Sequence, residues 1–411
     1  MTPSTRHIAY INAAHSFTHY SLLILPTAVL AMAVPGGRFG DAYGPILALA
    51  TGMFVLYGLG SLPQGWIAQR VGRKALLFCF FVGTGLSLVA TAFASSPFAL
   101  AVALGATGAF AAIYHPIGTA MLVDAAGDRP GRAIGVNGVF GNLGVALAPV
   151  VTAFVAHQAG WRAAFLLPGI ACATVGLAWL RVPWQDTTVR RSLRPFPTIP
   201  PHVVRRAVIV LLLIAIVSGL VFNAFTLLLP KLLEERLASR PGLLPLVGAA
   251  AFIATLFGAL TQFTVGRLID RTTLKRVFLP VSVILVPALI AISYAQGWIV
   301  VPIAGLVAAA IFGQVTVNET MTARYISPEL RTRIYSVRFF VGFLGAAASA
   351  PLVAALQAQT GSLTAVTLIM AAFGSVTLGC ALFFPDRKEE LQPELWAATE
   401  EGVTVGMAAA E

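Results

Sequence analysis

The feature that most constrains this chain is a succession of long apolar runs separated by short polar gaps. Each run reaches the roughly 20 residues that an α-helix needs to cross the hydrocarbon core of a bilayer. Only 10% of the 411 residues are charged and 58% are hydrophobic, whereas about a quarter of the residues in soluble domains are charged. We therefore predict an all-α membrane protein. Its twelve expected spans are residues 8–34, 45–68, 75–94, 98–123, 133–158, 164–183, 206–234, 244–268, 277–296, 299–323, 334–358 and 364–384.

The distribution of Lys and Arg predicts the orientation. Twelve spans place both termini on the same side of the membrane, and most basic residues fall in gaps on that side, such as 70–74 and 190–194. The opposite gaps hold few, among them Arg38 and Arg162. Because basic loops stay in the cytoplasm, we expect both termini to be cytoplasmic in a bacterial inner membrane. The net charge of +11 then reflects topology, and we expect lipid, not nucleic acid, as the partner of these charges.

The second half of the chain repeats the first at a constant offset. The related pairs are Gly65 with Gly266, Arg70 with Arg271, Lys74 with Lys275, Gly141 with Gly342 and Gly144 with Gly345. Parallel repeats of this kind place a substrate site between two halves, near the middle of the membrane. We predict an N-terminal six-helix bundle at 1–183, a cytoplasmic linker at 184–205, a C-terminal six-helix bundle at 206–384 and a cytoplasmic tail at 385–411.

The loop after the second span resembles the signature of the major facilitator superfamily, G-x-x-x-D-R-x-G-R-K. It reads GWIAQRVGRK from Gly65 to Lys74, and its repeat reads GRLIDRTTLKR from Gly266 to Arg276. The first copy has Gln69 in place of the acid, and the second has Thr273 in place of the second glycine. Together with the spans and the half-repeat, the resemblance covers essentially the full length. It implies two pseudo-symmetric six-helix bundles around a central cavity, working by alternating access.

The two loop copies supply the candidate residues of a cytoplasmic gate, which are Gly65, Gln69, Arg70, Arg73, Lys74, Gly266, Asp270, Arg271 and Lys275. One interpretation is that the basic residues only anchor the topology. That interpretation does not account for Asp270, because an acid adds nothing to the positive-inside bias. An acid could instead meet the positive N-terminal end of a helix from the other half and hold the cytoplasmic side closed, which is the role that the resemblance implies.

Two further stretches resemble the fosmidomycin-resistance branch of the superfamily, which is associated with drug efflux. They are YHPIGTAMLVD in the fourth span and GVFGNLGVALAPV in the fifth. Ile117 stands where that branch usually has an acid. The segment from Gly141 to Pro149 also resembles the glycine-proline motif of superfamily antiporters, although its small residues would equally serve close helix packing.

His15 and His19 lie one turn apart in the first span and therefore share a helix face. They could be packing residues with neutral, hydrogen-bonded rings, or they could line the central cavity and exchange protons near physiological pH. Metal binding is a weaker interpretation, because neither Cys nor an acid accompanies them. Polar groups inside a bilayer usually face a cavity or a partner. The residues expected to line a cavity for substrate or protons are His15, Thr18, His19, His115, Asn137, Asn142, Asn223, Gln262, Gln314, Glu319 and Arg338.

Glu319 and Arg338 are expected at similar depth on consecutive antiparallel spans. Glu319 precedes Arg324 by five residues, and Arg338 follows Arg333 by five, a rise of about 7.5 Å in each helix. The two side chains could form a structural salt bridge, or they could serve as a protonation site and an anion-binding group.

The sequence carries no phosphate-binding loop, nucleophile–base pair or metal signature, so we expect neither an enzyme nor a bound cofactor. We predict a monomeric secondary active transporter of a small organic solute. One acid against one Arg and three His in the cavity set favours an anionic or neutral solute, because a hydrophobic cation would prefer a free buried acid. Proton-coupled efflux is favoured by the resemblance. Proton-coupled uptake is the alternative, and a transporter-like sensor is a further one.

Overall fold

The computed structural model describes residues 3–126, 130–184, 199, 201–237, 243–269, 271–326 and 328–384. All regular secondary structure in these residues is helical. Most of the predicted linker, the predicted tail and the gate residue Asp270 lie outside the described residues.

The described residues of the first half form nine helices. They are α1 (Pro3–Leu22), α2 (Ile24–Met32), α3 (Tyr43–Ala48), α4 (Thr51–Ser61), α5 (Gln64–Val71), α6 (Arg73–Ala92), α7 (Pro97–Ala111), α8 (Tyr114–Ala126) and α9 (Pro130–Trp179). The second half forms α10 (Pro201–Arg236), α11 (Leu244–Ile269), α12 (Leu274–Tyr294), the short 3₁₀ helix η1 (Gly297–Ile299), α13 (Val300–Tyr325), α14 (Pro328–Thr360) and α15 (Leu363–Phe383).

Each of the twelve predicted spans falls on helix. Ten stretches of the described residues are long and apolar enough to cross a membrane. One of them, Gly135–Trp179, has 45 residues, about twice what a bilayer crossing needs. Gly160 interrupts it with a φ of 81° and a ψ of 161°, a conformation open to glycine, so α9 is two crossings. Counting α1 with α2 as a further crossing gives the predicted twelve.

Proline residues break the first and fourth spans beside the histidines. Proline has no N–H for the carbonyl four residues before it. Pro26 follows the break at Leu23, which separates α1 from α2, and Pro116 follows the break between α7 and α8. His19 therefore lies in the last turn of α1, and His115 lies in the first turn of α8. Broken helices near the middle of a bundle are a feature of transporter sites.

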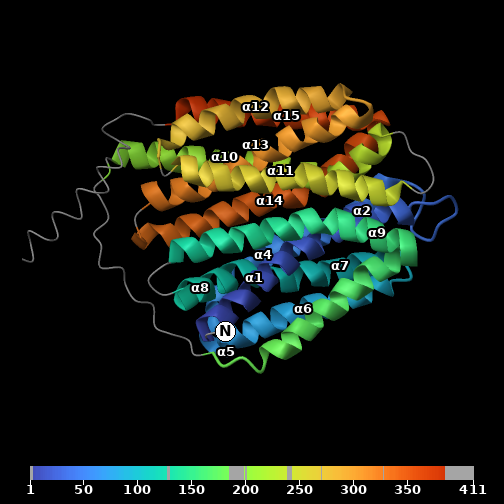
Figure 1. The fold of residues 1–411 in the computed structure, drawn as a ribbon, viewed down its shortest axis with the longest axis horizontal. Coiled ribbons are helices and arrows are strands. Elements are labelled where there is room, and N and C mark those ends of the chain that lie inside the picture. Colours follow the sequence, from blue (N-terminus) through green and yellow to red (C-terminus); the bar gives the residue numbers. More distant parts are fainter. Residues whose placement is uncertain are drawn as a thin grey trace, which may run out of the picture.

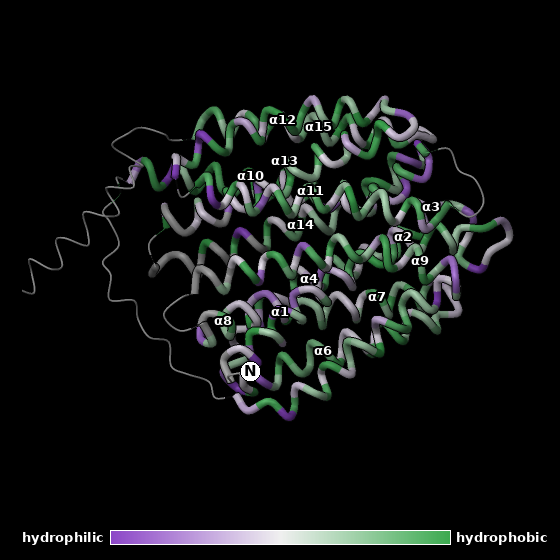
Figure 2. Tube along the Cα trace, in the orientation of Figure 1, coloured by the Kyte–Doolittle hydropathy of each residue, from purple (hydrophilic) through white to green (hydrophobic). Residues whose placement is uncertain are grey.

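The two halves lie side by side with their helices along the long axis of the molecule (Figure 1). Hydrophobic residues dominate along the helices, and hydrophilic ones gather toward helix ends and loops (Figure 2). Between the halves, α9 packs against α11, α14 packs against α3 and α4, and α10 packs against α2. This arrangement of two six-helix bundles confirms the predicted architecture.

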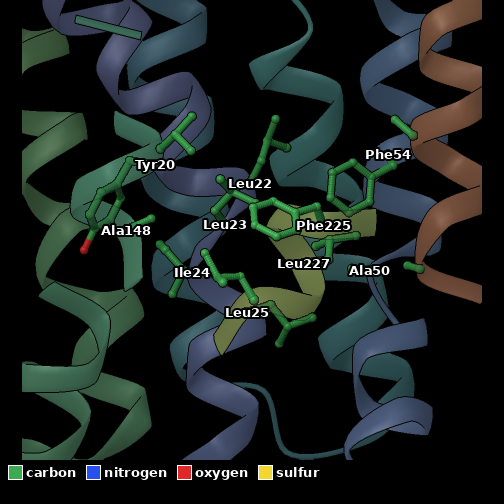
Figure 3. Packing of buried hydrophobic residues seen from close by; sticks show 14 of the residues in the cluster. Tyr20, Leu22, Leu23, Ile24, Leu25, Ala50, Phe54, Ala148, Phe225 and Leu227 are labelled. Carbon is green, nitrogen blue, oxygen red and sulfur yellow. The ribbon is translucent and has the colours of Figure 1, made fainter. Parts of the chain in front are cut away.

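A large apolar core runs across the boundary between the halves. Leu22, Leu23 and Leu25 of the first span pack with Phe225 and Leu227 of α10 (Figure 3). A second core, which includes Val203, Phe278 and Phe384, contains residues of the second half only. The continuous core joins the halves over the part of the interface that includes α2 and α10, and this is the end opposite the predicted cytoplasmic loops.

Candidate functional site

The structure brings three predicted cavity residues together in the first half. His15 and His19 of α1 meet His115 of α8, and one nitrogen from each ring lies within 4.8 Å of the other two. The Nε2 atoms of His15 and His19 are 3.2 Å apart. The ring centroids are separated by 5.0 Å, 5.3 Å and 5.5 Å. All three side chains are half-buried. We refer to these residues as the histidine triad.

A buried hydrogen-bond network fixes one corner of the triad. His15 Nδ1 lies 2.7 Å from the backbone carbonyl oxygen of Asn137 on α9. Because a carbonyl can only accept, His15 donates through Nδ1. The Asn137 side chain donates to Asn12 Oδ1 at 2.8 Å and accepts from the Tyr114 hydroxyl at 3.0 Å. The Tyr114 ring stacks on His15 with a centroid distance of 4.8 Å.

Two glycines of α9 allow this close approach of α1. A Cβ on Gly141 would lie 2.5 Å from the His15 ring, and one on Gly144 would lie 2.3 Å from the carbonyl oxygen of Ser16. The second half repeats the arrangement, because a Cβ on Gly345 of α14 would lie 2.8 Å from the carbonyl oxygen of Ile216 on α10. The glycine-rich segment of the fifth span is therefore a packing surface in this structure.

Aromatic rings connect the histidine triad to the second half. His115 lies 6.2 Å from the Tyr57 ring of α4, measured between centroids. Tyr57 in turn makes an edge contact with Phe343 of α14 at 4.8 Å. Five residues before Phe343 in the same helix is Arg338, which is 9% exposed. The triad is thus linked through Tyr57 to the helix of the second half that also carries the buried Arg338.

The second half contributes a polar face of α13. Gln314 and Asn318 are one turn apart, and they are 1% and 5% exposed. Ser218 of α10 donates to Gln314 Oε1 at 3.0 Å. Gln314 Nε2 and Asn318 Oδ1 have no hydrogen-bond partner among the described residues. Buried polar atoms normally have one, so these two are exceptions among the described residues. Glu319 lies in α13, but its side chain is outside the described part.

The remaining predicted cavity residues make other contacts. The Asn142 side chain donates to Gln262 of α11 and so joins the halves. Thr18 donates to the carbonyl of Ala14, and Asn223 donates to the carbonyl of Gly219, each within its own helix. That these residues line a solute cavity stays a prediction.

The first predicted gate loop contains an ion pair. Arg73 Nη2 lies 2.7 Å from Asp124 Oδ2 of α8. Gln69 and Arg70 are exposed, and the Arg70 guanidinium stacks over Trp66 at 3.4 Å. Neither Gly65 nor Gly266 makes a close helix contact with the described residues, because an added Cβ at either would meet nothing among them nearer than 3.9 Å. Asp124 thus supplies the loop with the carboxylate that Gln69 cannot.

The two equivalent gate lysines hold helix ends. Lys74 Nζ donates to the carbonyl of Leu180 at 3.1 Å, just after the end of α9. Lys275 Nζ donates to the carbonyls of Leu382 and Phe384 at 2.9 Å and 3.1 Å, at the end of α15. A cation at a helix C-terminus satisfies free carbonyls and the helix dipole. The repeat in sequence is therefore a repeat in helix capping. Arg271, its neighbour in the second loop, is exposed.

The sequence reasoning overlooked Asn12, Tyr57 and Tyr114. Asn12 lies three residues before His15, and Tyr114 immediately precedes His115, so their position next to the histidines was a usable signal. Nothing in the sequence alone indicated that Tyr57 contacts both His115 and Phe343.

Comparisons with known proteins agree with this architecture. The profile of the Major Facilitator Superfamily matches residues 17–244 and 241–405. A solved structure described as a bacterial homologue of the human lysosomal transporter Spinster, inward-facing and unoccupied, superposes with a TM-score of 0.62 at 14% identity, covering 93% of this chain and 95% of the other. That likeness shows the fold alone.

Two curated relatives match over part of their length. A gallate transporter of Pseudomonas putida is 31% identical over 145 residues, which is 34% of this chain and 31% of the relative. A probable sulfoacetate transporter of Cupriavidus necator is 32% identical over 128 residues, which is 30% of this chain and 28% of the relative. The chain thus matches less than a third of either relative. The resemblance to the fosmidomycin-resistance branch stays a prediction.

Proposed function

This chain belongs to the Major Facilitator Superfamily, and we propose that it is a secondary active transporter that carries a small organic anion between its two halves. In this proposal it works as a monomer by alternating access in a bacterial inner membrane, with both termini in the cytoplasm and without a cofactor. Gates at the membrane surfaces, including the loops of Arg73 and Lys275, would open in alternation.

The observation that carries the proposal is the polar surface of α13 and α14. A charged side chain inside a bilayer usually faces a cavity or a partner, and such residues often mark a substrate pathway. Arg338 is 9% exposed, and on the neighbouring helix the Gln314 amide nitrogen is buried without a partner among the described residues. A carboxylate or sulfonate accepts hydrogen bonds from both groups, and arginine is suited to such planar, two-point recognition.

The relatives support the same solute class. One is described as a gallate transporter and the other as a probable sulfoacetate transporter. Gallate carries a carboxylate, and sulfoacetate carries a carboxylate and a sulfonate. The rings of Tyr57 and Phe343, which meet between the halves, would accommodate a planar or compact organic anion.

We assign proton coupling to this transport, with Glu319 as the acid that the sequence places within α13. Efflux by proton exchange is supported by the resemblance of the α9 segment to the antiporter motif. Proton-coupled uptake is the second candidate. The negative charge of the solute favours it, because uptake is the direction in which an anion needs proton coupling. An inside-negative potential expels an anion by about 2.3 kcal/mol per charge per 100 mV, so uptake requires accompanying protons, whereas efflux of a monovalent anion does not.

The test is transport by purified protein in liposomes with an imposed pH gradient. Labelled gallate and sulfoacetate are offered beside a quaternary ammonium cation and a neutral sugar. We expect accumulation of an anion and not of the cation. Accumulation into an alkaline interior indicates co-transport, and accumulation into an acidic interior indicates exchange. Transport of the cation alone would contradict the proposal.

Arg338 is tested in the same assay. Arg338→Gln should abolish anion transport, and Arg338→Lys should retain part of it, because lysine keeps the charge but not the planar guanidinium. Arg267→Gln is the matched control, since Arg267 is exposed and stacks over Phe263. Wild-type transport by Arg338→Gln would remove Arg338 from the anion site.

A further inference from the structure

We propose that the histidine triad binds a divalent transition-metal ion of the Zn²⁺, Co²⁺, Ni²⁺ or Cu²⁺ class. His15, His19 and His115 each offer one ring nitrogen, and the three nitrogens lie within 4.8 Å of one another. Imidazole is the side chain that these ions prefer, whereas Mg²⁺ and Ca²⁺ prefer oxygen ligands. The proposal stands on this geometry and does not depend on the solute or direction of transport.

The distances are close to those of a metal site. At metal–nitrogen distances of 2.0–2.1 Å, two ligands of a tetrahedral ion are roughly 3.3 Å apart. The Nε2 atoms of His15 and His19 are already 3.2 Å apart. The i and i+4 spacing on one helix is the arrangement by which two histidines share a metal. The remaining adjustment is a movement of at most ~1.5 Å by ring nitrogens, which side-chain rotation supplies.

His15 is already oriented as a metal ligand. Its Nδ1–H donates to the carbonyl of Asn137 at 2.7 Å, which leaves the lone pair on Nε2 directed toward His19. Metal-binding histidines almost always make such a hydrogen bond through the other ring nitrogen, and it fixes both tautomer and ring orientation. His19 Nε2 donates to His15 Nε2 in this arrangement. A bound ion takes the place of that proton, which moves to Nδ1 of the same neutral ring, so the ring needs no net loss of a proton.

The surroundings hold the rings in place. The His15 ring stacks on Tyr114 at 4.8 Å, and it approaches Gly141 so closely that a Cβ there would lie 2.5 Å from it. His115 lies in the first turn of α8, immediately before Pro116, so the helix break sets its position. Three protein ligands leave a fourth coordination position open for water or for an oxygen of an anion. Among the described residues, the candidate metal group consists of these three histidines alone.

The experiment is a titration of purified, detergent-solubilised protein with Co²⁺, monitored by visible absorption. The protein carries an affinity tag without histidine. We expect a ligand-field band that saturates at one Co²⁺ per chain and that Zn²⁺ displaces. His15→Ala, His19→Ala and His115→Ala should each weaken Co²⁺ binding by at least about tenfold. Loss of a residue that only hydrogen-bonds to a ligand already weakens metal binding by about 10–100-fold.

His157→Ala is the matched control, because His157 is an exposed histidine of α9 and its loss should leave the titration unchanged. His19→Gln serves as a second variant that keeps hydrogen-bonding capacity, and size-exclusion elution identifies any variant that fails to fold. The absence of a band in the wild-type protein would overturn the proposal. The proposal would also be overturned if a folded His19→Gln or His115→Ala protein bound Co²⁺ with the same titration curve as the wild type.

Discussion

Asn142 of α9 donates a hydrogen bond from its side-chain amide to the side-chain oxygen of Gln262 on α11. This bond joins the two halves of the protein inside the membrane. It lies along an interface where the helices are in close contact, because a Cβ on Gly248 would lie 2.5 Å from the Ala153 side chain. Both side chains are half-buried. The hydrogen bond therefore gives each amide a polar partner inside the membrane.

We predict that Asn142 and Gln262 are energetically coupled. Asn142→Ala and Gln262→Ala should each lower the free energy of unfolding, and the double variant should lose less than the sum, with a coupling of about 0.5–1.5 kcal/mol. Thermal unfolding of the four proteins in detergent measures this. Asn223→Ala with Gln262→Ala is the control pair, because Asn223 bonds within its own helix. Additive losses for Asn142 and Gln262 would show that the bond does not form.

The glycines of α9 give a second prediction. Gly144→Ala should destabilise the protein by about 1–3 kcal/mol, because the new methyl group would press on the Ser16 carbonyl of α1 and force the helices apart. Gly138→Ala is the control on the same helix, since nothing lies within 4 Å of its Cβ position. That substitution should be neutral or stabilising by up to about 1 kcal/mol, since alanine favours helix. Equal effects at both positions would contradict the packing role.

The architecture was predictable from the sequence. The length of each apolar run indicates a bilayer crossing, and the repeated glycines indicate where helices come into close contact. The twelve spans fall on helix, and the offset that relates Gly144 to Gly345 reappears as two equivalent helix contacts. The shared face of His15 and His19 was predictable for the same reason, since helical periodicity fixes it.

The partners of those residues were not predictable. Periodicity gives a face but not the helix that meets it, so the sequence could not pair Asn142 with Gln262 or Asp124 with Arg73. It also did not predict that Thr18 and Asn223 each bond to the carbonyl one turn back in their own helix, as short polar side chains in a helix often do. Their place in a solute cavity stays a prediction. The latch predicted for Asp270 and the pair predicted for Glu319 and Arg338 each involve a residue or side chain outside the described part, Asp270 and Glu319, and both stay predictions.

The lysine caps give a third prediction. Lys74→Met and Lys275→Met should each lower the free energy of unfolding by about 0.3–2 kcal/mol, because each removes a cation from the C-terminal carbonyls of a helix. Arg276→Met is the control, since Arg276 is exposed next to Lys275 in the first turn of α12. Chemical or thermal unfolding in detergent measures the change. A loss for Arg276→Met equal to that for Lys275→Met would assign the effect to general surface charge, not to capping.

The last prediction concerns the contact between the halves near α3. The Tyr43 hydroxyl lies 3.1 Å from the carbonyl of Pro26 and 2.9 Å from that of Leu227, so its one proton is shared between the first half and the second. Tyr43→Phe removes this bond and keeps the ring. Because a buried hydrogen bond contributes about 0.5–1.5 kcal/mol, the population with this end of the bundle open should rise by up to about tenfold.

Thiol labelling measures that population. A cysteine replaces Thr27, which lines the small cavity between α2, α9, α10 and α11. The exposed Cys79 is changed to Ser, and the buried Cys172 and Cys380 are kept. In sealed vesicles, a membrane-impermeant reagent should label the new cysteine faster in the Tyr43→Phe background. Tyr294→Phe is the control, because Tyr294 is 65% exposed and should leave labelling unchanged. If Tyr43→Phe also leaves labelling unchanged, the hydroxyl packs at this interface without holding it closed, and the apolar contacts of Leu25 and Leu227 suffice.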